Sequence, residues 1–168
     1  MKPIEAYKAF WKNTFNIKGR ATRSEFWHPF WINIVIGIIT TIIDHFIGGQ
    51  LVNSLFSLVL VIPMFTIGVR RLHDINEPMT LQVIHTIIGI IAVVISLIFL
   101  GIITGLEASN ASDDAFGVSA LVFLGILFII AIISLVIFIL LVIKWAKPGD
   151  EYENKYGMAR VVTGNKSY

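Results

Sequence analysis

The stretch VSALVFLGILFIIAIISLVIFILLVI, residues 118–143, decides the fold because it is 26 residues long and carries no charge. A helix rises about 1.5 Å per residue, so this run is longer than the roughly 30 Å thickness of a bilayer's hydrocarbon core. Three further apolar stretches meet the same length requirement, at about 30–47, 51–69 and 81–103. We therefore predict an all-α integral membrane protein with four transmembrane helices.

The composition also indicates a membrane protein. The chain has 168 residues, of which 56% are hydrophobic and 14% charged, and its mean hydropathy is +0.81. A soluble globular protein of this composition would have too little polar surface to cover its core. The chain lacks cysteine, which excludes disulfides, thiolate metal sites and cysteine nucleophiles. The N-terminal residues do not match a signal peptide, and no repeat or linker divides the chain, so we expect one uncleaved membrane domain over residues 1–168.

The basic residues are segregated along the chain. Six lie before the first span, two between the second and third, and five after the fourth. The loops at about 44–50 and 104–117 contain none, and their charged residues are all acidic. Because Lys and Arg mark cytoplasmic loops, this distribution predicts that both termini and the middle loop are cytoplasmic.

The N-terminal segment PIEAYKAFWKNTFNI, residues 3–17, has a helical hydrophobic period. Ile4, Tyr7, Trp11 and Phe15 fall on one face, and lysines fall on another. This pattern is typical of an amphipathic helix that lies in the membrane interface. An ordinary flank whose aromatic residues join the interfacial belt is equally compatible with the pattern.

The start of the first spanning helix has two readings. Thr22 and Glu25 have the spacing of a capping box, which predicts a helix that begins at Arg23. Pro29 would then fall inside the helix, where it removes a backbone hydrogen bond. The alternative is a helix that begins with Pro29 in its first turn.

The middle loop begins in GVRRLHD, residues 68–74. If the helix continues past the membrane, Arg70 and Asp74 are spaced to pair, while Arg71 points toward lipid phosphates or another cytoplasmic segment. Glu25 is a candidate partner for either arginine, because burying such charges without a partner is costly. The plainer interpretation is that the arginines only orient the protein in the membrane.

Several ionisable residues suggest other functions. His73 beside Asp74 resembles part of a metal or general-base site, but no three or four ligands have a metal-binding spacing, so we expect no metal. Asp44, His45 and His85 lie in or near the spans, where ionisable groups are functional candidates by default. Together with Pro63 in the second span, they raise the alternative of a small transporter or channel subunit.

Three motifs, GRATRSEFW, IPMFTIGVRRLHD and ENKYG, occur in the chain in this order. In this they resemble the Domain of Unknown Function 805 family of small bacterial inner-membrane proteins. The resemblance implies a multi-span domain in the bacterial inner membrane over nearly the whole chain, and it implies no particular activity. The chain departs from the family pattern after Asp74, where INEPMTLQV replaces a short turn with Gly and Ser that leads into tryptophans.

These observations lead to a hypothesis of association at the cytoplasmic face. We expect a non-enzymatic protein without cofactors or nucleic-acid partners, because no nucleophile and base can be identified. Its expected ligands are anionic lipid head groups, with a membrane-protein partner or a second copy of the chain as alternatives. The polar cluster predicted to act there comprises Arg20, Arg23, Glu25, Arg70, Arg71, His73 and Asp74.

Overall fold

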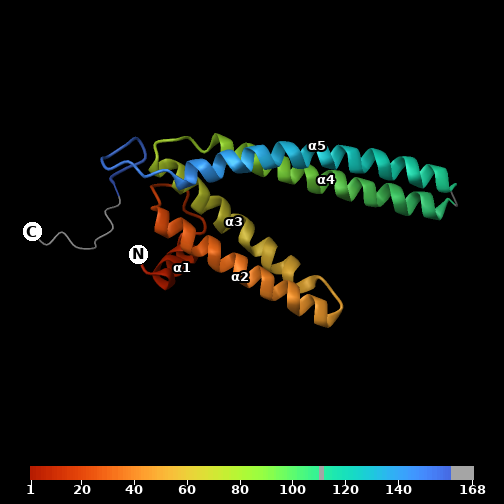
Figure 1. Cartoon of the computed structure of the whole chain (residues 1–168), viewed down its shortest axis with the longest axis horizontal. Coiled ribbons are helices and arrows are strands. Elements are labelled where there is room, and N and C mark those ends of the chain that lie inside the picture. The colour runs from red at the N-terminus through yellow and green to blue at the C-terminus, as the bar shows by residue number, and fades with distance from the viewer. Residues whose placement is uncertain (110–111, 160–168) are drawn as a thin grey trace, which may run out of the picture. The chain divides into compact units, whose positions relative to one another are not determined.

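The computed structural model describes residues 1–109 and 112–159, and these contain five helices and no strand. The helices are labelled in Figure 1. Four of them are long and apolar enough to cross a membrane. The predicted all-α fold with four spans is therefore confirmed. In chain order the helices are α1 (Pro3–Lys12), α2 (Arg23–Ile47), α3 (Leu51–Asp74), α4 (Thr80–Ala108) and α5 (Asp113–Ala146).

The chain forms two compact units. Unit 1 comprises Met1–Met79 and the chain from Ile143 on, and unit 2 comprises Thr80–Val142. Unit 1 holds α1, α2, α3 and the end of α5, whereas unit 2 is the hairpin of α4 and α5. That the two units form a single membrane domain stays a prediction from the sequence.

The first spanning helix begins where the capping box predicts. The Thr22 hydroxyl accepts the Glu25 amide at 3.3 Å, and the Glu25 carboxylate accepts the Thr22 amide at 2.8 Å. Pro29 lies inside α2, so the alternative start at Pro29 is wrong. The reciprocal cap satisfies two N-terminal amides of the helix, whereas the proline removes a single bond within it.

The α2–α3 turn is built around Asp44. Gly48 takes a left-handed conformation with φ of 74°, which ends α2. The Asp44 carboxylate then accepts the backbone amides of Val52 at 3.0 Å and Asn53 at 2.8 Å, in the first turn of α3. Because an acidic side chain is favourable at a helix N-terminus, Asp44 acts as the cap of the next helix.

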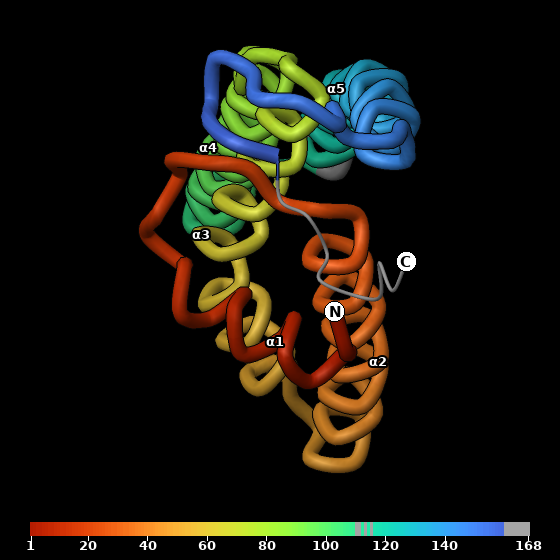
Figure 2. Tube along the Cα trace, turned by 90° about the vertical axis from the view of Figure 1, so that its left-hand side faces the viewer, coloured from red at the N-terminus to blue at the C-terminus, as the bar shows by residue number. Residues whose placement is uncertain are grey.

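Helix α1 packs against α2 and α3 (Figure 2). Its buried residues are Ala6 and Phe10, and the Tyr7 hydroxyl donates to Asn33 of α2 at 3.1 Å. A helix is confirmed in this segment, but it ends before Phe15, and Ile4 and Trp11 are exposed; that it lies in the membrane interface stays a prediction. Apolar residues occupy both sides of this short helix, so its period alone could not determine which side packs.

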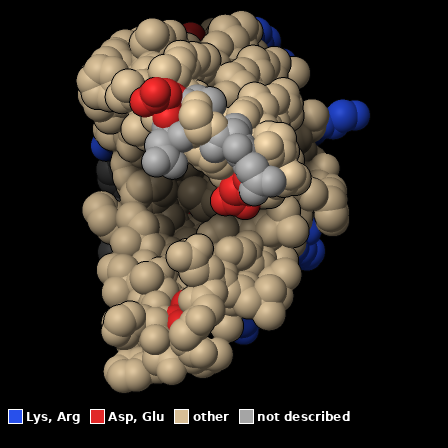
Figure 3. Space-filling view, turned by 90° about the vertical axis from the view of Figure 1, so that its right-hand side faces the viewer, with Lys and Arg blue, Asp and Glu red and all other residues tan. Residues whose placement is uncertain are grey.

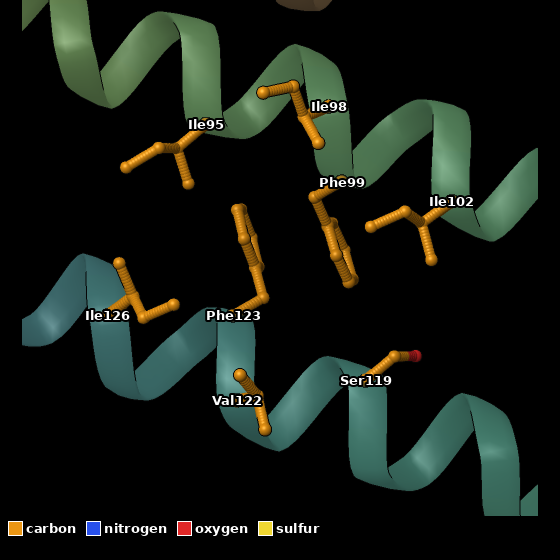
Figure 4. A pocket seen from close by; sticks show the side chains of 8 residues that line it. All are labelled: Ile95, Ile98, Phe99, Ile102, Ser119, Val122, Phe123 and Ile126. Atoms are coloured by element: carbon orange, nitrogen blue, oxygen red, sulfur yellow. The ribbon is translucent and has the colours of Figure 1, made fainter.

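Unit 2 is a long apolar hairpin. The rings of Phe99 and Phe123 stack with centroids 3.8 Å apart, and His85 Nε2 lies 3.2 Å from the Ser134 hydroxyl. Figure 4 shows a cavity of about 290 Å³ between α4 and α5 beside the stacked rings. The predicted loop between these helices includes residues 110–111, which lie outside the described residues. The side chains that line the cavity are Ile95, Ile98, Phe99, Ile102, Ser119, Val122, Phe123 and Ile126.

The molecular surface also suits a lipid environment. Figure 3 looks onto the ends of helices, where the charged side chains that face the viewer are acidic and basic ones appear only at the rim. The helices α4 and α5 bury almost none of their apolar windows within the protein, at 0% and 6%. In a bilayer these side chains contact acyl chains, which are as apolar as the side chains themselves.

Candidate functional site: a buried arginine–aspartate cluster

Three segments that are far apart in sequence meet at one end of unit 1. They are the linker 19–21 between α1 and α2, the last turn of α3, and the segment 147–157 after α5, which we call the strap. Figure 2 shows the blue strap beside the end of α3. The Ala21 amide donates to the Arg70 carbonyl at 2.9 Å, and the Asp150 amide donates to the Asp74 carbonyl at 2.8 Å. Backbone hydrogen bonds therefore fasten both the linker and the strap to α3.

Asp74 lies at the centre of this cluster and is 4% exposed. One carboxylate oxygen accepts the Arg20 Nε at 2.9 Å, and the other pairs with the Arg71 guanidinium. Arg20 comes from the linker and Arg71 from the preceding turn of α3. Charge-assisted bonds of this kind are strong, and their removal in a buried place is costly.

The remaining donors of Arg71 reach the C-terminal end of α5. Its Nε donates to the Trp145 carbonyl at 2.9 Å, and its second terminal nitrogen donates to the Lys147 carbonyl. The residue has no exposed surface. A guanidinium placed there satisfies carbonyls that have no partner within the helix, and it lies at the negative end of the helix dipole.

Arg20 binds the strap. Its terminal nitrogens donate to the carbonyls of Tyr152 at 2.7 Å and Gly157 at 3.3 Å, and to that of Asp150. A further bond at 3.3 Å reaches the Asp74 carbonyl at the end of α3. Arg20 and Arg71 therefore direct their donors inward, onto the carbonyls of their own chain.

The other predicted arginines differ in exposure. Arg70 is buried and donates to the Arg20 carbonyl at 3.2 Å. Arg23 is exposed, and its Nε donates to the Lys147 carbonyl at 2.9 Å. Glu25 is buried and caps α2 through Thr22. That Glu25 also pairs with Arg70 or Arg71 stays a prediction.

His73 anchors the end of the strap by stacking. Its ring lies on the Tyr156 ring with centroids 3.8 Å apart and an interplanar angle of 8°, and its Nδ1 lies 3.2 Å from the Gly19 carbonyl. The side-chain amide of Asn154 donates to the His73 carbonyl at 3.0 Å and to the Asp150 carboxylate at 2.9 Å. Over residues 1–109 and 112–159, no three His, Cys, Asp or Glu side chains gather in a way that could hold a metal ion.

Gly149 belongs to this cluster but was not predicted from the sequence. A Cβ at this position would lie 2.7 Å from Cγ of Asp74, so only glycine lets the strap approach the carboxylate. The pair Pro148–Gly149 is a turn signal in the sequence, but it does not indicate what the turn contacts. Trp145 was missed as well, and its indole donates to the Gly68 carbonyl at 3.2 Å.

Its four candidate spans and its all-helical fold place the protein in the class of helical, multi-span membrane proteins. The chain belongs to the family described as protein of unknown function (DUF805), whose model matches residues 14–118. This match confirms the family and includes the first two motifs, whereas the third, ENKYG at residues 153–157, lies outside it, so the match does not extend over nearly the whole chain as expected. The matched range includes the linker and the end of α3, and the strap lies beyond it.

The chain is also similar to two proteins of Escherichia coli (strain K12). It is 32% identical to inner membrane protein YhaI over 76 residues, which are 44% of this chain and 64% of that protein. It is 25% identical to inner membrane protein YhaH over 80 residues, which are 44% of this chain and 66% of that protein. The chain thus covers less than two thirds of either relative. No solved structure matches it.

Proposed function

We propose that the protein acts by association, without catalysis, at the end of unit 1 that carries the cluster, and that it binds anionic lipid head groups there. The protein is a multi-span protein of the bacterial inner membrane: two relatives are named inner membrane proteins, and four of its helices are long enough to span. The charge distribution predicts that the cluster lies on the cytoplasmic side, where anionic lipids attract basic residues.

One observation carries the proposal: the basic residues of this end divide into two sets. The buried arginines use their donors on carbonyls of their own chain. A second set is exposed in unit 1, and the bond of this kind that it makes among residues 1–109 and 112–159 is that of Arg23 to the strap. The exposed set consists of Lys2, Lys8, Lys12, Lys18, Arg23, Lys147 and Lys155.

This division favours a diffuse attraction over a phosphate pocket made by the arginine pair of α3. Arg70 and Arg71 are 2% and 0% exposed, so a head group that bound their guanidinium groups would have to displace the bonds described above. Each exposed basic residue near the membrane contributes roughly 1 kcal/mol to attraction of anionic lipid. The lysines and Arg23 together provide the favourable charge.

The alternative of a transporter was suggested by Asp44 and His85, and the contacts of these two residues give it little support. Asp44 caps α3 through two amides of that helix. His85 lies at hydrogen-bond distance from Ser134 within the α4–α5 hairpin. Both contacts are ones that a stable bundle uses, and neither requires a transported ion.

Native mass spectrometry of the purified protein tests the proposal by measuring co-purified anionic lipid. We expect Lys8→Gln with Lys12→Gln to reduce the bound anionic lipid clearly, and Arg23→Lys to leave it unchanged because the charge is retained. Lys144→Gln is the matched control, since Lys144 is already paired with Glu77 at 2.6 Å. A protein that shows no preference for anionic over zwitterionic lipid contradicts the proposal.

A further inference from the structure

We propose that α1 and the loop that follows it, residues 13–18, form a wedge immersed in the inner leaflet, with Phe15 among the acyl chains and the neighbouring lysines at the phosphates. The inference rests on the proposed association with lipid, and it names the part of the chain that makes the contact. The ligand is the boundary between head groups and acyl chains, an environment suited to amphipathic helices.

The depth of the wedge follows from two hydrogen bonds to spanning helices. The Thr66 hydroxyl of α3 donates to the Thr14 carbonyl at 2.7 Å. Thr66 precedes Asp74, the last residue of α3, by eight positions, which is about 12 Å along a helix. The loop is therefore held well below the end of α3, at a level where α3 is still part of the apolar stretch that ends near residue 69.

The second bond fixes α1 at a similar level. The Tyr7 hydroxyl donates to Asn33, which lies ten positions after Arg23, or about 15 Å along α2. The chain then returns from the loop through Ile17 and Gly19 to the cluster at the helix ends. Segment 3–18 thus occupies a lower level than the arginines that follow it in sequence.

The free side of α1 has the composition of a membrane interface. Ile4, Lys8, Trp11 and Lys12 are all exposed. Lysine side chains place their apolar stems along hydrocarbon and their ammonium groups at the phosphates, and tryptophan is enriched at this level. The opposite side of α1 is already buried against α2 and α3 through Ala6 and Phe10.

The loop exposes its apolar side chains in the same way. Phe15 is 83% exposed and Ile17 is 42% exposed, and they lie between Lys12 and Lys18. Large apolar groups lie here next to lysines, at the level of an apolar stretch of α3. This combination suits the boundary between lipid head groups and acyl chains. A protein partner on this face would need acidic groups of its own to pair with the lysines.

Site-directed spin labelling tests the wedge directly, because the chain contains no cysteine and a single introduced cysteine is unique. We use the full chain in nanodiscs that contain anionic lipid, with a label at Phe15→Cys. The matched control is Tyr152→Cys in the strap, because Tyr152 is 82% exposed, almost the same as Phe15, but lies outside the wedge. Collision rates with oxygen, which concentrates in hydrocarbon, and with a nickel chelate, which stays in water, report the depth of each label.

We expect the label at Phe15 to collide with oxygen several-fold more than with the nickel chelate, and the label at Tyr152 to show the reverse. Nickel accessibility at Phe15 equal to that at Tyr152 places the loop in water and overturns the inference. An immobilised label with low accessibility to both reagents indicates a protein partner or a second copy on this face, and it overturns the inference too.

Two further measurements separate this inference from the proposed function. In nanodiscs of zwitterionic lipid alone, the label at Phe15 should stay in the hydrocarbon, because the Thr66 and Asn33 bonds hold the segment. If mass spectrometry shows no preference for anionic lipid while the label at Phe15 lies in the hydrocarbon, only the proposed function is contradicted. A water-exposed label in a protein that still prefers anionic lipid contradicts only the wedge.

Discussion

Replacing Asp74 with asparagine should destabilise unit 1 more than any other conservative change in the cluster. The carboxylate accepts charged donors from two buried residues, Arg20 and Arg71. An asparagine of the same size keeps one acceptor oxygen, but its NH₂ group faces an arginine donor. One charge-assisted bond is lost and the other is weakened, and each is worth about 1.5–3 kcal/mol. Removal of one partner from a buried ion pair costs about 3–5 kcal/mol.

We expect a loss of about 3 kcal/mol, at the lower end of that range, because both arginines keep their bonds to backbone carbonyls. The loss corresponds to roughly a hundredfold change in the unfolding equilibrium. Unfolding in detergent, followed by circular dichroism, measures it. Asp150→Asn is the matched control, since the Asp150 carboxylate accepts a neutral amide donor from Asn154. Equal losses in the two variants would refute the central role of Asp74.

Other changes test the remaining contacts. Gly149→Ala should loosen the strap and lower the thermal midpoint, whereas Gly101→Ala, whose added Cβ meets open space, should not, as thermal scans will show. Asp44→Ala should cost about 1–2 kcal/mol in detergent unfolding because it removes the cap of α3. In a double-mutant cycle of Glu25→Gln and Arg70→Gln, additive losses would contradict the predicted pair. A periplasm-active reporter should work when fused between α4 and α5 and fail at the C-terminus, and activity at the C-terminus would overturn the topology.

The spans and the helix start could be predicted because their causes are local. An apolar run long enough to cross a bilayer identifies a span without knowledge of its neighbours. The capping box of Thr22 and Glu25 also lies within four residues, and the structure forms it as expected. The helices extend beyond the predicted spans, to Asp74 in α3 and to Ala108 in α4, because hydropathy identifies the hydrocarbon region and not the ends of hydrogen bonding.

The cluster could be predicted only in part. Arg20, Arg71 and Asp74 were all predicted to belong to the cluster, and the structure brings these three together. Helical spacing predicted Arg70 as the partner of Asp74, whereas the two bridges to Asp74 described above come from Arg20 and Arg71. Spacing within a helix could not reveal that Arg20, 54 positions away, reaches the same carboxylate.

The motif ENKYG marks the end of the strap in the sequence, but the contacts of the strap with Arg20 and Arg71 were not predicted, because these contacts use backbone carbonyls. Arg20 and Arg71 bind backbone carbonyls there, and every residue has a carbonyl. The close approach of Gly149 to Asp74 restricts the residue type there, but glycine is common in turns that make no such approach. Contacts of this kind become visible only once the chain has been folded in space.

Polar groups fasten the linker, the end of α3 and the strap to one another. Within a bilayer, apolar side chains gain little by leaving lipid for one another, because acyl chains are equally apolar. Hydrogen bonds from a guanidinium are directional, and a buried guanidinium has few other acceptors within reach. These bonds therefore select one arrangement of the linker, α3 and the strap. The buried arginines therefore fix the shape of this end of the protein, and the exposed lysines and Arg23 remain available to bind what lies outside it.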